Sequence, residues 1–163
     1  MKGAVLALGA CFTLLVAVAP ARQGGCGALS LDDYLKHSDV AAIFTGMVTA
    51  VKAVPNSSTW PRDRRQIGTM TVTRVWKGEV SSTTALHLWF TEGRDREAGF
   101  QPSVEYVAIA HELSPESRAS FGLPWTGERE LGVNGWGSCS VMQADGPSAL
   151  RLIGAAPGYP PKP

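Results

Sequence analysis

Hydrophobic and polar residues alternate through several segments in the middle of the chain. A period of two is typical of strands that bury one face. Residues 66–76 place Met70 and Val72 on one face. Ile67 and Val75 lie on the other, so either face could be the core. The pattern predicts five strands, at residues 40–53, 66–76, 83–91, 104–111 and 128–133.

Two short helical patterns flank these strands. Ser30-Leu31-Asp32-Asp33 has the form of a capping box, in which the serine side chain accepts from an early amide and the acidic residue complements the helix dipole. It predicts a helix at residues 31–37. A second helix is predicted only at about 147–153, because Asp145-Gly146-Pro147 interrupts the pattern before it. The predicted loops, at residues 54–64, 92–103 and 112–127, are rich in glycine, proline or charge.

These elements predict one mainly β domain. Five strands with a short helix at each end match a five-stranded OB-type barrel with short flanking helices. Gly46, inside the long first strand, suits the bulge or corner that such a barrel needs. We find no repeat and no domain boundary within residues 26–154, and the domain is expected to span residues 22–154. The four prolines of residues 155–163 predict an extended, poorly ordered tail after the domain.

The first 21 residues predict a cleaved export signal. Lys2 precedes an apolar run from Ala4 to Val18, and Ala19-Pro20-Ala21 supplies the small residues that a signal peptidase accepts. The run is short for a membrane span, which leaves a buried or anchoring helix as the alternative. Leu8-Gly9-Ala10-Cys11 has the form of a lipid-attachment box, but the sequence stays apolar after it. We therefore expect a secreted or periplasmic protein with no stable membrane insertion after cleavage.

The charge balance limits the partners that are expected, and the cysteine content indicates whether a disulfide forms. The chain has 15 Lys and Arg against 14 Asp and Glu, and Lys2 belongs to the signal. A neutral balance provides no field to attract nucleic acid. Cys11 is removed with the signal, so Cys26 and Cys139 remain as an even pair in an oxidising compartment, and we expect a disulfide between them. Free thiols, or pairing between chains, are the alternatives.

Residues with catalytic potential are few. His111-Glu112 lacks the second histidine of a zinc-protease helix and fits the end of a buried strand. His37-Ser38-Asp39 could belong to a hydrolase set, but a histidine at a helix C-terminus is favourable for the dipole alone. His87 alternates outward and is expected to be solvated, and Ser138 lacks the glycines of a nucleophile elbow. The sequence therefore predicts no enzyme, no metal and no cofactor; a site assembled from scattered residues is the alternative.

Tryptophans in predicted loops are the stronger functional signal. Tryptophan is the residue type most enriched at binding hot spots, although packing against a barrel end is the alternative for each of them. Three arginines follow Trp60 and would add a basic, stacking surface, unless they form a solvated turn with Asp63 as a partial counter-ion. The candidate interaction residues are Trp60, Arg62, Arg64, Arg65, Trp125 and Trp136.

The segment Val72-Thr73-Arg74-Val75-Trp76-Lys77-Gly78 combines an alternating strand with a lysine-glycine turn. A helix signal and the strand Phe44–Val48 precede it, and the strand Tyr106–Ala110 follows it. Single cysteines stand at both ends. On these features, from Cys26 to Gly154, the chain resembles secreted bacterial proteins with a fold like that of the tissue inhibitors of metalloproteinases, in the netrin-like branch of the OB-folds.

The resemblance implies a scaffold rather than an activity. The resemblance implies that, in the animal inhibitors, the amino group and carbonyl of an N-terminal cysteine chelate the zinc of the protease. That position is Gly24 here, so the inhibitor mechanism is not supported. The relatives carry a further cysteine just before the strand that corresponds to Tyr106–Ala110, and that position falls near Ala98-Gly99 here. The resemblance implies a bridge between this position and that of Gly24, and in this chain both of its cysteines are absent. We expect a non-enzymatic module that binds an extracellular or envelope protein; the alternatives are a protease inhibitor using another loop, an enzyme, or a saccharide-binding module.

Overall fold

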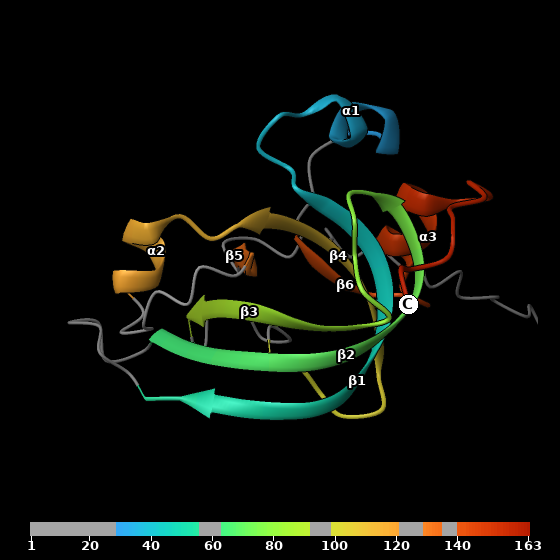
Figure 1. The fold of residues 1–163 in the computed structure, drawn as a ribbon. Coiled ribbons are helices and arrows are strands. Elements are labelled where there is room, and N and C mark those ends of the chain that lie inside the picture. The colour runs from blue at the N-terminus through green and yellow to red at the C-terminus, as the bar shows by residue number, and fades with distance from the viewer. Residues whose placement is uncertain (1–28, 56–62, 92–98, 121–128, 135–139) are drawn as a thin grey trace, which may run out of the picture.

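A computed structural model of the protein describes residues 29–55, 63–91, 99–120, 129–134 and 140–163. The strands form one strongly curved sheet with three short helices outside it (Figure 1). The strands are β1 (Ala42–Val54), β2 (Asp63–Lys77), β3 (Thr83–Thr91), β4 (Glu105–Glu112), β5 (Leu131–Asn134) and β6 (Val141–Gln143). The helices are α1 (Leu31–Lys36), α2 (Pro115–Ser120) and α3 (Pro147–Ile153).

The sheet closes into a five-stranded barrel. Its strand order is β1-β2-β3-β5-β4, and β4 returns to pair with β1. β3 and β5 run parallel, whereas the other paired strands run antiparallel. β6 lies outside the barrel and pairs with β4. This topology is that of an OB-type barrel, so the predicted fold class is confirmed.

The sequence did not predict α2 or β6. The proline and glycine content of residues 112–127 predicted a loop, but Pro115–Ser120 is helical. Ser114 begins this helix, because its hydroxyl accepts from the N–H of Ser117 (3.1 Å) and its carbonyl accepts from the N–H of Arg118 (2.9 Å). A serine cap followed by proline in the first turn is an ordinary helix start. β6 has only three residues, too few to show alternation.

The barrel core changes from one face of β2 to the other. Met70 and Val72 are buried in it, and so is Val75, from the face predicted as the alternative. The register makes this possible, because β2 contains an extra residue, Thr73, opposite the shift between Thr45 and Gly46 of β1. Gly46 thus lies at a bulge, as the sequence predicted. Neither face of β2 is the core along its whole length.

A second apolar cluster, on the outside of the barrel, holds the terminal helices. Val40, Ile43 and Ile109 are its buried members. The capping box of α1 is formed as predicted, since Ser30 Oγ accepts from Asp33 N (3.2 Å) and Asp33 Oδ2 accepts from Ser30 N (2.9 Å). The partly buried side chains that complete the cluster are Leu31 and Tyr34 from α1, Trp76 from β2, Met142 from β6 and Leu152 from α3.

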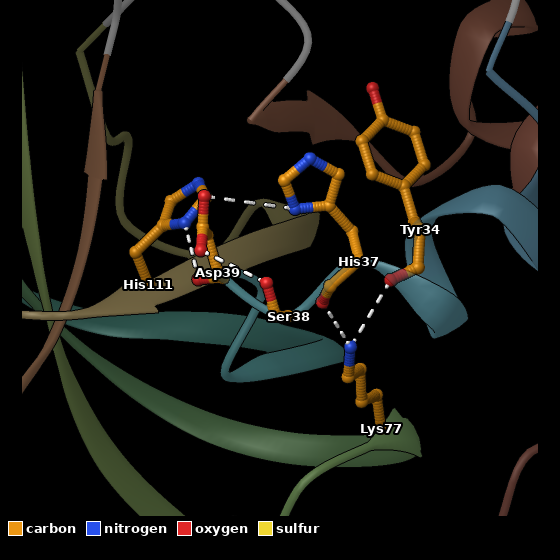
Figure 2. Close-up of polar contacts among 6 residues, drawn as sticks. All are labelled: Tyr34, His37, Ser38, Asp39, Lys77 and His111. Carbon is orange, nitrogen blue, oxygen red and sulfur yellow. Dashed lines mark hydrogen bonds and ion pairs between the residues drawn. The ribbon is translucent and has the colours of Figure 1, made fainter.

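Lys77 and Gly78, at the end of β2, attach α1 to the barrel. Lys77 Nζ donates to the carbonyl oxygens of Tyr34 (3.2 Å) and His37 (2.7 Å), where α1 ends (Figure 2). A cation is favourable there because the C-terminus of a helix is the negative end of the helix dipole. Gly78 has a φ of 78°, and a Cβ at this position would overlap the carbonyl oxygen of Ala41. The position therefore requires glycine.

The segment after α3 is hydrogen-bonded to the barrel. Tyr159 and Val75 exchange two backbone hydrogen bonds, of 2.7 and 2.8 Å. Lys162 donates its N–H to Val80 O (2.9 Å) and accepts from Ser82 N (2.7 Å). The proline content predicted an extended, poorly ordered tail. The segment is extended, but its two bridging residues are non-prolines that add backbone bonds to the end of β2 and to the turn that follows it.

Candidate functional site

The outer face of β2 and β3 carries a buried arginine against a tryptophan. Arg65 and Trp89 are direct partners in the register of these strands. The guanidinium carbon of Arg65 lies 6.0 Å from the centroid of the Trp89 ring, and Arg65 is only 7% exposed. This geometry is a cation–π contact. Sequence reasoning missed Trp89, although its alternation with Leu88 and Phe90 marks it as an outward-facing aromatic.

Arg64 and Arg65 lie in β2 rather than in the loop predicted for residues 54–64. The strand begins at Asp63, because the pairing with β3 continues as far as Thr91 opposite Asp63, and the pairing with β1 continues as far as Val54 opposite Arg65. Adjacent residues of a strand point to opposite faces. Arg64 is exposed, whereas Arg65 is buried. The two arginines therefore do not form the single basic surface that the sequence suggested.

The remaining predicted site residues lie outside the described part of the chain. In the sequence, Trp60 and Arg62 belong to the connection between β1 and β2, Trp125 to that between β4 and β5, and Trp136 to that between β5 and β6. The expected disulfide partners, Cys26 and Cys139, also fall there. Their roles stay predictions.

His87 belongs to a buried charged cluster on the same outer face. Arg118 of α2 is 1% exposed, and its Nη2 lies 2.9 Å from Oε1 of Glu130. The other carboxylate oxygen of Glu130 lies 3.6 Å from His87 Nε2. The sequence predicted that His87 points outward and is solvated. It does alternate with the core residues of β3, but it is only 8% exposed, so the solvated role is wrong.

Burial has a direct consequence for the charge of His87. It is the largest cause that lowers the pKa of this imidazole; the Glu130 carboxylate acts to raise the pKa, and the Arg118 guanidinium acts to lower it further. In the unfolded chain a histidine titrates at about 6.5. Because the pKa in the folded state is lower, the neutral form contributes stability above the unfolded pKa, and this stability is lost as pH falls through the folded pKa.

We therefore expect acid to destabilise the protein through His87. The midpoint of urea unfolding should fall as the pH is lowered below about 6.5. In a His87→Gln variant this decrease should become shallower, because the buried titrating group is gone. His37→Gln, which replaces an exposed histidine, is the matched control and should keep the dependence of the parent. Equal slopes for the parent and the His87→Gln variant would rule out this role.

A second polar cluster lies at the end of α1, and it contains the hydrolase-like residues. Figure 2 shows that His37 and His111 both approach Asp39. Ser38 Oγ donates to Asp39 Oδ1 (3.2 Å), and His37 Nδ1 lies 4.0 Å from Asp39 Oδ2. His111 Nδ1 lies 2.6 Å from the backbone oxygen of Asp39, which makes it the donor of that hydrogen bond.

This arrangement is not that of an activated nucleophile. A serine nucleophile needs a histidine that accepts its proton and a carboxylate that orients the histidine. Here the hydroxyl of Ser38 and the ring of His37 both face the same carboxylate, that of Asp39. His37 is the C-cap of α1, and its N–H donates to Tyr34 O (3.2 Å), so the predicted place at the helix C-terminus is confirmed.

The described residues contain neither a candidate metal site nor a candidate membrane-spanning helix. Within those residues no group of three or more His, Cys, Asp or Glu side chains could hold a metal ion. None of the helices described here is both long and apolar enough to cross a membrane. Comparisons of the chain with protein families, with curated proteins and with solved structures found no match.

Proposed function

We propose that the protein is a secreted, non-enzymatic interaction module that binds an extracellular or envelope protein. The strand order carries this proposal. In OB-type barrels, ligands bind on the face of the second and third strands and at the loops that join strands 1–2 and 4–5. In this chain the β1–β2 connection contains Trp60 and Arg62, and the β4–β5 connection contains Trp125.

The composition of this end of the barrel suits a protein partner. Tryptophan and arginine are the residue types most enriched among binding hot spots. Trp60 and Arg62 continue in sequence from the end of the barrel at which β2 begins, where Arg65 packs against Trp89 and is itself buried. The resemblance to the netrin-like proteins supports the same proposal, because it implies a scaffold whose loops make the contacts.

The contacts of the histidines support binding over catalysis. His37 ends a helix, His111 donates to a backbone carbonyl, and His87 is buried beside Glu130. Each therefore has a packing or hydrogen-bonding role that requires no substrate. Protease inhibition through a loop is a special case of this function, in which the partner is a protease.

Substitution of Trp60 by alanine tests the proposal. The parent protein, immobilised, should capture a partner from the secreted and envelope fractions. The Trp60→Ala variant should lose that capture with an almost unchanged melting temperature, because a hot-spot side chain contributes to binding rather than to the core. If Trp60 instead packs against the barrel, the variant should lose about 3 to 5 kcal/mol of stability.

Trp76→Phe provides the matched control. Trp76 packs in the outer apolar cluster, and its Nε1 donates to Ala156 O (3.2 Å). Its replacement should lower the melting temperature and leave capture intact. A Trp60→Ala variant that is destabilised and still captures every partner of the parent would contradict the proposal.

A further inference from the structure

β1 continues beyond the point where the barrel closes. It pairs with β4 only over Ala42–Met47, but it pairs with β2 as far as Val54. Val48 then exchanges backbone bonds with the segment before β4, donating to Val104 O (3.0 Å) and accepting from Ser103 N (2.8 Å). Beyond it, no described residue pairs with the outer edge of β1 from Ala50 to Val54. In Figure 1 this edge forms the rim of the sheet.

The comparable edge of β2 is completed by the chain itself. Where β2 continues beyond its pairing with β3, Tyr159 supplies a carbonyl and an N–H to Val75. A short extended segment is thus sufficient to satisfy an exposed strand edge in this fold. The edge at Ala50–Val54 offers the same kind of backbone groups without such a segment among the described residues.

The chemistry of this edge indicates what would bind there. Every second residue of an edge strand directs its N–H and C=O away from the sheet, and an extended chain matches such a row of groups. Ala50 and Ala53 are small and exposed, so no bulky side chain blocks the approach. The five residues span about 17 Å, enough for a short added strand.

The charges along the edge favour an acidic occupant. Ala50–Val54 and their partners in β2, Arg65–Thr69, contain no carboxylate. Lys52 is exposed on the edge strand itself. A second copy of the same edge would bring its own Lys52 into the pair, whereas an acidic strand would place a carboxylate near Lys52.

We propose that the β1 edge from Ala50 to Val54 binds an extended, acidic segment of the partner protein as an added antiparallel strand. This inference rests on the proposed function, because it assigns the chemistry of the partner. It assigns backbone hydrogen bonds to β1 and aromatic contacts to the β1–β2 connection, which contains Trp60 in the sequence. The two kinds of contact can therefore be tested separately.

A synthetic peptide of alternating valine and glutamate, seven residues long, tests the inference. Fluorescence anisotropy should show that it binds the protein, and hydrogen exchange should show slower exchange of the amides within Ala50–Val54. A peptide with lysine in place of glutamate should bind more weakly. Methylation of alternate backbone nitrogens on the peptide edge that faces β1 should weaken binding about tenfold or more, since those hydrogen bonds can no longer form.

Two charge-reversal variants distinguish a local effect of Lys52 at the edge from an effect of the overall charge of the protein. Lys52→Glu should weaken binding of the acidic peptide about fivefold. Lys36→Glu makes the same change on α1, at the other side of the barrel, and should leave binding unchanged (Figure 1). Equal effects of the two variants would overturn the inference.

Other outcomes would also overturn it. The inference fails if the peptide does not bind, or if N-methylation of the peptide leaves binding unchanged. It also fails if the protein forms a dimer that protects Ala50–Val54 without peptide, because a second copy would then be the occupant. If any of these occurs while partner capture still depends on Trp60, the inference about the edge fails and the proposed function stands. If the protein captures no partner at all, the proposed function fails.

Discussion

Replacing Arg118 with alanine is expected to lower the free energy of unfolding by about 3 to 5 kcal/mol. The guanidinium is almost fully buried and lies 2.9 Å from Glu130. Its removal leaves a carboxylate that is already poorly satisfied, because Oε2 of Glu130 has no hydrogen-bond donor among the described residues. An uncompensated buried charge is costly. Urea denaturation at pH 7.5 measures the loss.

The neighbouring pair Arg129–Glu112 provides the control for Arg118. It has a separation of 3.3 Å, but its side chains are 42% and 62% exposed. Arg129→Ala should therefore cost about 0 to 1 kcal/mol. In a double variant, Arg118→Met with Glu130→Leu, much of the stability should return because no charge is left buried. If the Arg118 and Arg129 variants are equally stable, the buried pair does not have this role.

Gly78→Ala is the second change with a large expected effect, about 3 to 5 kcal/mol of stability. Two costs combine at this position. The φ of 78° disfavours any side chain, and the added Cβ would overlap the backbone oxygen of Ala41 at the start of β1. The direction of the Cβ is fixed by its own backbone and the oxygen of Ala41 belongs to the backbone, so neither can turn away. Thermal unfolding followed by circular dichroism measures the loss.

Gly154 separates the two costs. It also has a positive φ, of 45°, but the nearest atom to an added Cβ is the carbonyl oxygen of Leu150 at 3.8 Å. Gly154→Ala should therefore show only the conformational cost, about 1 to 3 kcal/mol. The explanation for Gly78 would be contradicted if the Gly154 variant were the less stable of the two.

The barrel could be predicted from the sequence because its strands are marked by alternating residues, as in β3, or by a continuous apolar run, as in β4, which is buried on both faces. Leu86 and Leu88 of β3, for example, fall in the core with polar or aromatic residues between them. Alternation records this burial directly. Alternation does not identify the core face of β2, where the extra residue Thr73 moves the core from one face to the other. A bulge depends on the partner strand, so the pattern of β2 alone could not decide between the faces.

The charged cluster could not be predicted in the same way. His87 follows the outward pattern of a solvated residue, but it is buried beside Glu130, which comes from a distant part of the sequence and pairs with Arg118. Arg118 lies in α2, which was not predicted because the proline and glycine residues of 112–127 indicated a loop. The placement of Arg64 and Arg65 could not be predicted for a related reason: strand pairing extends further than the turn residues indicated, and it separates the two side chains.

The bonding of Tyr159 and Lys162 to the barrel also restricts the order of folding. The edge of β2 at Val75 and the turn at Val80 receive their backbone partners from residues that follow every strand in the sequence. During synthesis, β1, β2 and β3 all emerge before those partners, so β2 can pair with β1 and β3 first. The edge stays available to chaperones and to neighbouring chains for that interval, and its closure is among the last events of folding.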